Sequence, residues 1–144
     1  MKILFLCVAN SARSQMAEGL ARNLYDDKAV VASAGSEPSK VNPFAIRAMK
    51  KIGIDITSHY SKPISEVLSD DIDLVVTLCA DEVCPIVPTS TKKEHWPFKD
   101  PAAASGSEEG ILTSFELIRD QIKAQLVDFG RRANLLKVTS NEES

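Results

Sequence analysis

The sequence has few of the residues that a metal-rich, secreted or nucleic-acid-binding protein would need. It contains three cysteines and two histidines, and its net charge is -3. Without a basic excess, general binding to nucleic acid or to an anionic membrane is not expected. No segment approaches the roughly 20 apolar residues of a membrane-spanning helix. Any anion-binding site must therefore be local.

The odd number of cysteines favours reduced thiols. The apolar run after Met1 is too short for a secretory signal, so we expect a cytoplasmic protein whose thiols do chemistry or simply pack. A zinc site would need four ligands at a regular spacing, which His59 and His95 do not complete. We expect neither a metal nor another cofactor.

The length of 144 residues, with 44% hydrophobic and 26% charged residues, is typical of one globular domain. We expect this domain to cover residues 1–138. The polar residues 139–144 should form a flexible C-terminal tail.

Apolar runs alternate with helical periodicity along the chain. Strands are predicted at 2–6, 30–32, 73–78 and 93–98. Helices are predicted from 14 to 24, from 43 to 52, from 64 to 68 and from 107 to 129. This alternation indicates an α/β domain with a four-stranded parallel sheet, flanked by helices on both faces. On the first helix, Gln15, Glu18 and Arg22 are expected to face away from the core.

The segment between the first strand and the first helix has the features of an oxyanion-binding loop. Its backbone N–H groups can point inward beside a helix N-terminus, and Arg13 can bind two oxygens of a tetrahedral anion. Cys7 would then be a thiolate nucleophile. The candidate binding residues follow it directly: Val8, Ala9, Asn10, Ser11, Ala12, Arg13 and Ser14.

Each loop residue also has a plainer interpretation. Cys7 can be a small buried residue at a strand end. Asn10 suits a tight loop because it tolerates unusual backbone angles. Ser14 can cap the helix, donate a hydrogen bond to the Cys7 thiolate, or do both. Ser11 can simply stabilise the loop.

Three further residues can reach the same edge of the sheet. In parallel sheets, ligands bind beyond the carboxyl ends of the strands, which is where Cys7 and Cys79 both fall. Asp100 precedes Pro101 and is either a turn residue or a general acid for a poor leaving group. The four residues between Cys79 and Cys84 permit a disulfide, although packing alone remains an alternative.

With these residues assembled, the chain resembles the bacterial arsenate reductases built on the low-molecular-weight protein tyrosine phosphatase fold. The similarity covers about residues 2–129. It rests on seven short segments of the sequence: 7–19, 33–35, 42–43, 53–56, 74–79, 94–96 and 100–101.

The resemblance implies a disulfide relay that detoxifies arsenate. Cys7 would attack arsenate held by the loop and Arg13, while Asp100 protonates the departing oxygen. Cys79 would release arsenite and leave a Cys7–Cys79 disulfide, and Cys84 would move it to Cys79–Cys84. Thioredoxin would then reduce that disulfide. Phosphate and sulfate would bind as analogues, and the enzyme would act as a monomer.

Departures from the family pattern leave alternatives open. Ala9 and Ala12 stand where a glycine and a further cysteine are usual. The short spacer after Cys79 keeps glutaredoxin with glutathione as an alternative reductant. Where some relatives have an acidic potassium ligand this chain has Lys62, whose ammonium is expected to pair with Glu18 and replace the ion.

Two other functions compete with arsenate reduction. One is a low-molecular-weight phosphotyrosine phosphatase that uses Cys7, Arg13 and Asp100. Such phosphatases usually carry tyrosines just after the Asp-Pro pair, where this chain has alanines at 102–104. The other is a non-catalytic anion or arsenite sensor, which would need no general acid.

Overall fold

The computed structural model describes residues 1–80, 85 and 91–137. Its strands are β1 (Lys2–Cys7), β2 (Val30–Gly35), β3 (Leu74–Thr77) and β4 (Lys92–His95). Its helices are α1 (Arg13–Leu24), α2 (Pro43–Lys50), α3 (Ile64–Val67), the short 3-10 helix η1 (Pro101–Ala103) and α4 (Glu108–Ala133). No helix in these ranges combines the length and the hydrophobicity needed to cross a membrane.

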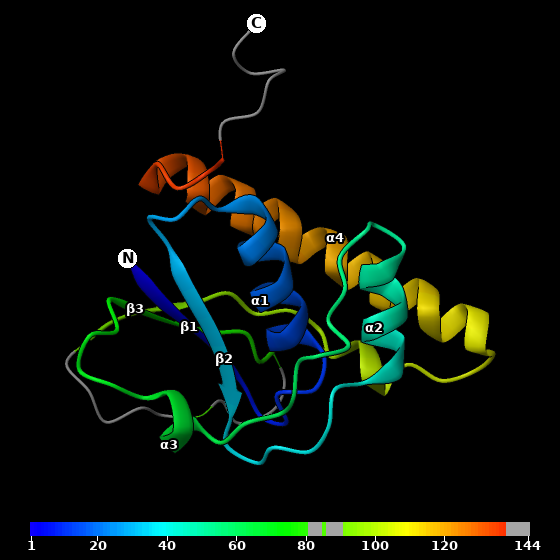
Figure 1. Ribbon diagram of the computed structural model, residues 1–144. Coiled ribbons are helices and arrows are strands. Elements are labelled where there is room, and N and C mark those ends of the chain that lie inside the picture. Colours follow the sequence, from blue (N-terminus) through cyan, green and yellow to red (C-terminus); the bar gives the residue numbers. More distant parts are fainter. Residues whose placement is uncertain (81–84, 86–90, 138–144) are drawn as a thin grey trace, which may run out of the picture.

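The four strands form one parallel sheet, as predicted, and their order in it is β2-β1-β3-β4. The sheet is covered on both faces because β1 is apolar on both sides. Ile3 and Phe5 join the cluster formed with α1, α2 and α4, whereas Leu4 and Leu6 pack on the side that carries α3. Figure 1 shows α1, α2 and α4 grouped together, with the short α3 apart from them.

Each of the four predicted strands has at least one wrong boundary; β1, for example, includes Cys7. β2 continues to Gly35, because residues 33–35 pair with the last three residues of β1. β3 is shorter than predicted and ends at Thr77. β4 ends at His95, two residues before Pro97, whose nitrogen cannot donate to a strand ladder.

Capping side chains confirm where α2 and α4 were predicted to start, but α2 ends at Lys50 rather than 52 and α4 continues to Ala133 rather than 129. Asn42 Oδ1 accepts a hydrogen bond of 2.8 Å from Phe44 N, with Pro43 at the first helical position of α2. Ser107 Oγ accepts from Gly110 N at the start of α4. Gly53, after α2, has a φ of 80°, a left-handed conformation that glycine adopts without strain.

Candidate active site

The candidate site lies beyond the carboxyl ends of the two central strands. Cys7 ends β1, and Cys79 follows β3 by two residues. Leu78 N donates to Leu6 O at 2.9 Å, which brings the segments that carry the two cysteines together. Both cysteine side chains are buried, 2% and 0% exposed. Their sequence separation therefore does not separate them in the fold.

The loop after Cys7 is held from outside through its carbonyl groups. Val8 O accepts from Glu37 N at 2.8 Å, and Ala9 O accepts from Ser39 N at 3.2 Å. A trans peptide places its N–H opposite its carbonyl. With these carbonyls bound outside the loop, the N–H groups of Ala9 and Asn10 point the other way, toward its concave side.

The next two peptide groups are also held through their carbonyls, so that their N–H groups point inward. Ser11 O accepts from Asn42 N at 2.9 Å, which turns the Ala12 N–H inward. Asn10 O accepts from Ser61 Oγ at 2.7 Å and from Gln15 Nε2 at 3.1 Å, which turns the Ser11 N–H inward. A run of inward N–H groups at a helix start is a concave binding site for an anion.

Gly35 allows the loop to lie this close to β2. A Cβ at this position would lie 2.4 Å from Val8 O and 2.8 Å from Asn10 N. These are backbone atoms, which cannot move without changing the loop. The end of β2 therefore needs glycine for steric reasons.

A chain of hydrogen bonds ends at the Cys7 sulfur. Asn10 Nδ2 donates to Ser14 Oγ at 2.7 Å, and Ser14 Oγ lies 2.8 Å from Cys7 Sγ. Since Ser14 Oγ accepts from Asn10, its own hydrogen is available to the sulfur. The alternative that Ser14 is the N-cap of α1 was wrong, because Ala12 occupies that position.

Arg13 connects the loop to the segment that follows β4. Its Nη1 donates to Phe98 O at 3.0 Å, and Phe98 N in turn donates to Leu78 O at 3.1 Å. Its Nη2 lies 3.9 Å from Asp100 Oδ2. The guanidinium side chain is 6% exposed and that of Asp100 is 38% exposed. The structure thus places Asp100 next to Arg13, the arginine predicted to bind the anion, with a carboxyl group open to solvent.

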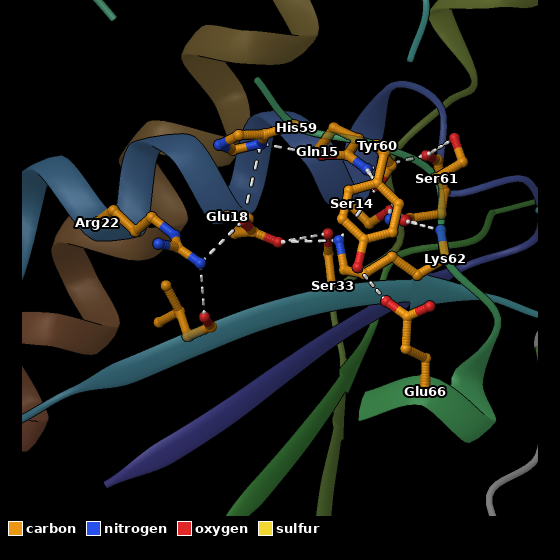
Figure 2. Close-up of polar contacts among 12 residues, drawn as sticks. Ser14, Gln15, Glu18, Arg22, Ser33, His59, Tyr60, Ser61, Lys62 and Glu66 are labelled. Atoms are coloured by element: carbon orange, nitrogen blue, oxygen red, sulfur yellow. Dashed lines mark hydrogen bonds and ion pairs between the residues drawn. The ribbon is translucent and has the colours of Figure 1, made fainter. Parts of the chain in front are cut away.

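Behind the loop, Glu18 is the centre of a buried polar cluster (Figure 2). Its Oε1 accepts from Ser33 Oγ at 2.7 Å and lies 3.8 Å from Lys62 Nζ. Its Oε2 lies 3.2 Å from Arg22 Nη2 and 3.7 Å from His59 Nδ1. Its side chain is 4% exposed, so a carboxylate in this position requires these partners.

The predicted orientation of the polar side of α1 was wrong for two residues. Gln15 is fully buried and Glu18 is 3% exposed, because the segment 57–62 crosses over this side of the helix. Arg22 remains exposed, as predicted. Periodicity places polar residues away from the helix core but does not reveal a second segment that covers them.

Sequence reasoning also missed His59, to which the sequence assigned no role beyond a zinc site that it cannot complete. Its side chain is 14% exposed, and its Nδ1 lies 3.0 Å from Gln15 Oε1. Burial lowers the pKa of this imidazole below its ordinary value of 6.5; Arg22 and Lys62 reinforce that effect and Glu18 opposes it. One feature of the sequence could have indicated that His59 is buried: it lies three residues before Lys62, which was expected to pair with Glu18.

Lys62 already brings a positive charge to this cluster. Besides Glu18, its Nζ contacts Tyr60 O at 3.2 Å and lies 4.8 Å from the centre of the Tyr60 ring. A carbonyl, a carboxylate and an aromatic face are all suited to a cation. Within the described ranges, no group of three or more His, Cys, Asp or Glu side chains is placed to hold a metal ion.

Two predictions concern residues outside the part of the chain that the structure describes. Cys84, the third predicted thiol, lies outside the described residues, as does the tail at 139–144. His95 is exposed, and its Nδ1 lies 2.8 Å from Thr77 Oγ1 across the β3–β4 pair.

Comparison with known proteins gives a consistent assignment. The low molecular weight phosphotyrosine protein phosphatase family matches residues 2–139. An arsenate reductase of Bacillus subtilis is 47% identical over 129 residues, which cover 88% of this chain and 93% of that protein.

Solved structures agree with this match. An arsenate reductase in its phosphate-binding state superposes with a TM-score of 0.78 and 37% identity, covering 91% of this chain and 97% of that one. A thioredoxin-dependent arsenate reductase of Corynebacterium glutamicum has a TM-score of 0.68 and 25% identity, covering 92% and 61%. Given the loop, the two buried thiols and these similarities, the chain belongs to the low molecular weight phosphotyrosine protein phosphatase family and, within it, to the arsenate reductases.

Proposed function

We propose that this chain reduces arsenate to arsenite through a relay of three thiols, Cys7, Cys79 and Cys84, with thioredoxin as the final reductant. The observation that carries the proposal is the placement of two buried cysteines at one edge of the sheet, where the anion-binding loop also lies. A phosphatase needs only the first of them.

In the first step, the Cys7 thiolate attacks arsenic and an arsenate oxygen leaves. Hydroxide is a poor leaving group, so a proton from Asp100 lets the oxygen leave as water. Arg13 and the inward N–H groups stabilise the negative charge on the remaining oxygens. Ser14 stabilises the thiolate before attack through its hydrogen bond.

In the second step, the Cys79 thiolate attacks Cys7 Sγ and the sulfur–arsenic bond breaks. Its electron pair stays on arsenic, which falls from the +5 to the +3 state and leaves as arsenite. The two sulfurs supply the two electrons and become the Cys7–Cys79 disulfide.

In the third step, Cys84 attacks Cys79 Sγ and Cys7 leaves as a thiolate. Thioredoxin then reduces the Cys79–Cys84 disulfide. The sequence spacing of Cys79 and Cys84 supports this step, and the similar Corynebacterium enzyme is thioredoxin-dependent. Glutathione with glutaredoxin is the alternative reductant.

The test compares wild type with Cys84→Ser in the presence of arsenate, thioredoxin, thioredoxin reductase and NADPH. We expect many turnovers from the wild type and a single turnover from the variant, whose Cys7–Cys79 disulfide cannot be passed on. Sustained turnover of the variant would show that an external thiol replaces Cys84. A wild type that consumes no NADPH in response to arsenate, with either donor system, would reject the proposal.

A further inference from the structure

One peptide of the anion-binding loop is held differently from its neighbours. The carbonyls before and after it accept hydrogen bonds from main-chain N–H groups of the segment 37–42. The Asn10–Ser11 peptide is instead held by side chains, since Asn10 O accepts from Gln15 Nε2 and Ser61 Oγ. Asn10 also has a φ of 49°, in the left-handed region that residues other than glycine seldom adopt. Its conformation therefore depends on those side chains.

Gln15 is fixed from both ends of its amide group. Its Nε2 lies 3.1 Å from Asn10 O, 3.0 Å from Asn10 Oδ1 and 3.0 Å from Tyr60 O. Its Oε1 lies 3.0 Å from His59 Nδ1, which donates to it. Three acceptor oxygens surround the amide nitrogen and one donor lies beside the amide oxygen. An orientation with the nitrogen and oxygen exchanged would lose these hydrogen bonds. The side chain is fully buried, so water cannot replace these bonds without a rearrangement.

We propose that Gln15 is a positioning residue for the tetrahedral oxyanion. It holds the Asn10 carbonyl outward, and the planar peptide then presents the Ser11 N–H to the anion. This role deepens the proposed function because it concerns the same site. It depends only on binding of an oxyanion by the loop and not on any redox step.

The test uses inorganic phosphate as the probe and Gln15→Met as the variant. Methionine has a similar length and fills the buried space, but it has no N–H to donate. Phosphate is titrated into labelled protein while the amide signals of Ala9, Ser11 and Ala12 are followed by NMR. Calorimetry gives the affinity, and the melting temperature is measured alongside.

We expect the phosphate-induced shift of the Ser11 amide to fall by about half or more in Gln15→Met, while Ala9 and Ala12 keep theirs. Phosphate should bind about tenfold more weakly, the low end of what a hydrogen bond to a charged group contributes. The matched control is Ser33→Ala, which removes a bond to Glu18 in the same buried cluster but none to the loop. It should bind phosphate like the wild type.

An unchanged Ser11 shift and an unchanged affinity in Gln15→Met would overturn the proposal. An equal loss at Ala9, Ser11 and Ala12 would also overturn it, because that is the result of general loosening. If Gln15→Met does not fold, Ser61→Ala removes the other donor to the same carbonyl from a less buried position, and the same Ser11 readout decides. A wild type that binds phosphate but does not reduce arsenate would reject the proposed function alone.

Discussion

Cys7, the proposed nucleophile, lies among side chains that contact its sulfur or border the loop proposed to bind the anion. Ser14 lies 2.8 Å from its sulfur, and Asn10 orients Ser14. Arg13 is oriented by Phe98 O, from the segment that also packs beside Leu78. A rigid, buried nucleophile with prearranged donors loses little free energy to reorganisation when the anion arrives.

The proposed role of Asp100 as a general acid can be tested by replacing its carboxyl group with an amide. In Asp100→Asn the shape is kept, but the side chain has no carboxyl proton to give to the departing oxygen. The rate of a single turnover of arsenate should fall by roughly 10²- to 10⁴-fold. Phosphate affinity should change by less than about threefold, because Asp100 contributes no donor to the loop.

The control for this variant is Asp71→Asn, which alters a surface carboxylate paired with Lys2. It should retain the wild-type rate. A wild-type rate in Asp100→Asn would remove the general acid from the mechanism.

At the scale of elements, the segment 57–62 functions together with α1. It covers Gln15 and Glu18 and brings Lys62 to the buried carboxylate (Figure 2). The loop is thereby supported from the segment 37–42 on one side and from 57–62 on another. Two connections between elements, rather than one helix end, set its shape.

We therefore expect the enzyme to be independent of potassium. Lys62 already supplies a positive charge near Glu18, so exchange of sodium for potassium at equal ionic strength should change the rate by less than about twofold. In Lys62→Ala the carboxylate loses this ammonium, and potassium should then raise the activity. The measurement is arsenate-dependent NADPH consumption in the two salts.

Lys51→Ala is the matched control, because Lys51 pairs with Glu116 on the surface and not with Glu18. It should behave like the wild type in both salts. A substantial increase in wild-type activity with potassium would contradict the role assigned to Lys62.

At the scale of the whole molecule, this buried cluster links folding to pH. His59 is the titratable group involved, and it faces Glu18, Arg22, Lys62 and Asp55. Its pKa in the folded state is lowered from 6.5, chiefly by burial. The folded state therefore favours the neutral imidazole.

The free energy of unfolding should fall as the pH drops below about 6.5, because the unfolded chain then binds a proton that folded His59 does not. Above that value both states are neutral and this contribution is constant. In His59→Gln the decrease between about pH 7 and pH 5 should become smaller. Urea unfolding at several pH values measures it.

The control is His95→Gln, which changes the other of the two histidines, an exposed one. It should preserve the wild-type pH dependence. If His59→Gln and wild type lose stability in parallel, other groups account for the dependence.

The sequence by itself determined the parallel sheet, the order of its elements and the loop that follows β1. These features follow from local rules. A continuous apolar run predicts a buried strand, and Asn42-Pro43 predicts a helix start. A loop between a strand and a helix can point several backbone N–H groups toward one anion. The proximity of Cys7 and Cys79 also followed, because the carboxyl ends of parallel strands share one edge.

Only the tertiary structure decided which polar residues are buried. Gln15, Glu18 and His59 have no local feature that distinguishes them from residues on a solvated surface. They are buried because two segments about 45 residues apart pack together and satisfy each other's hydrogen bonds. Such pairing depends on long-range packing, which periodicity does not encode. The same pairing holds the Asn10–Ser11 peptide of the loop that follows Cys7.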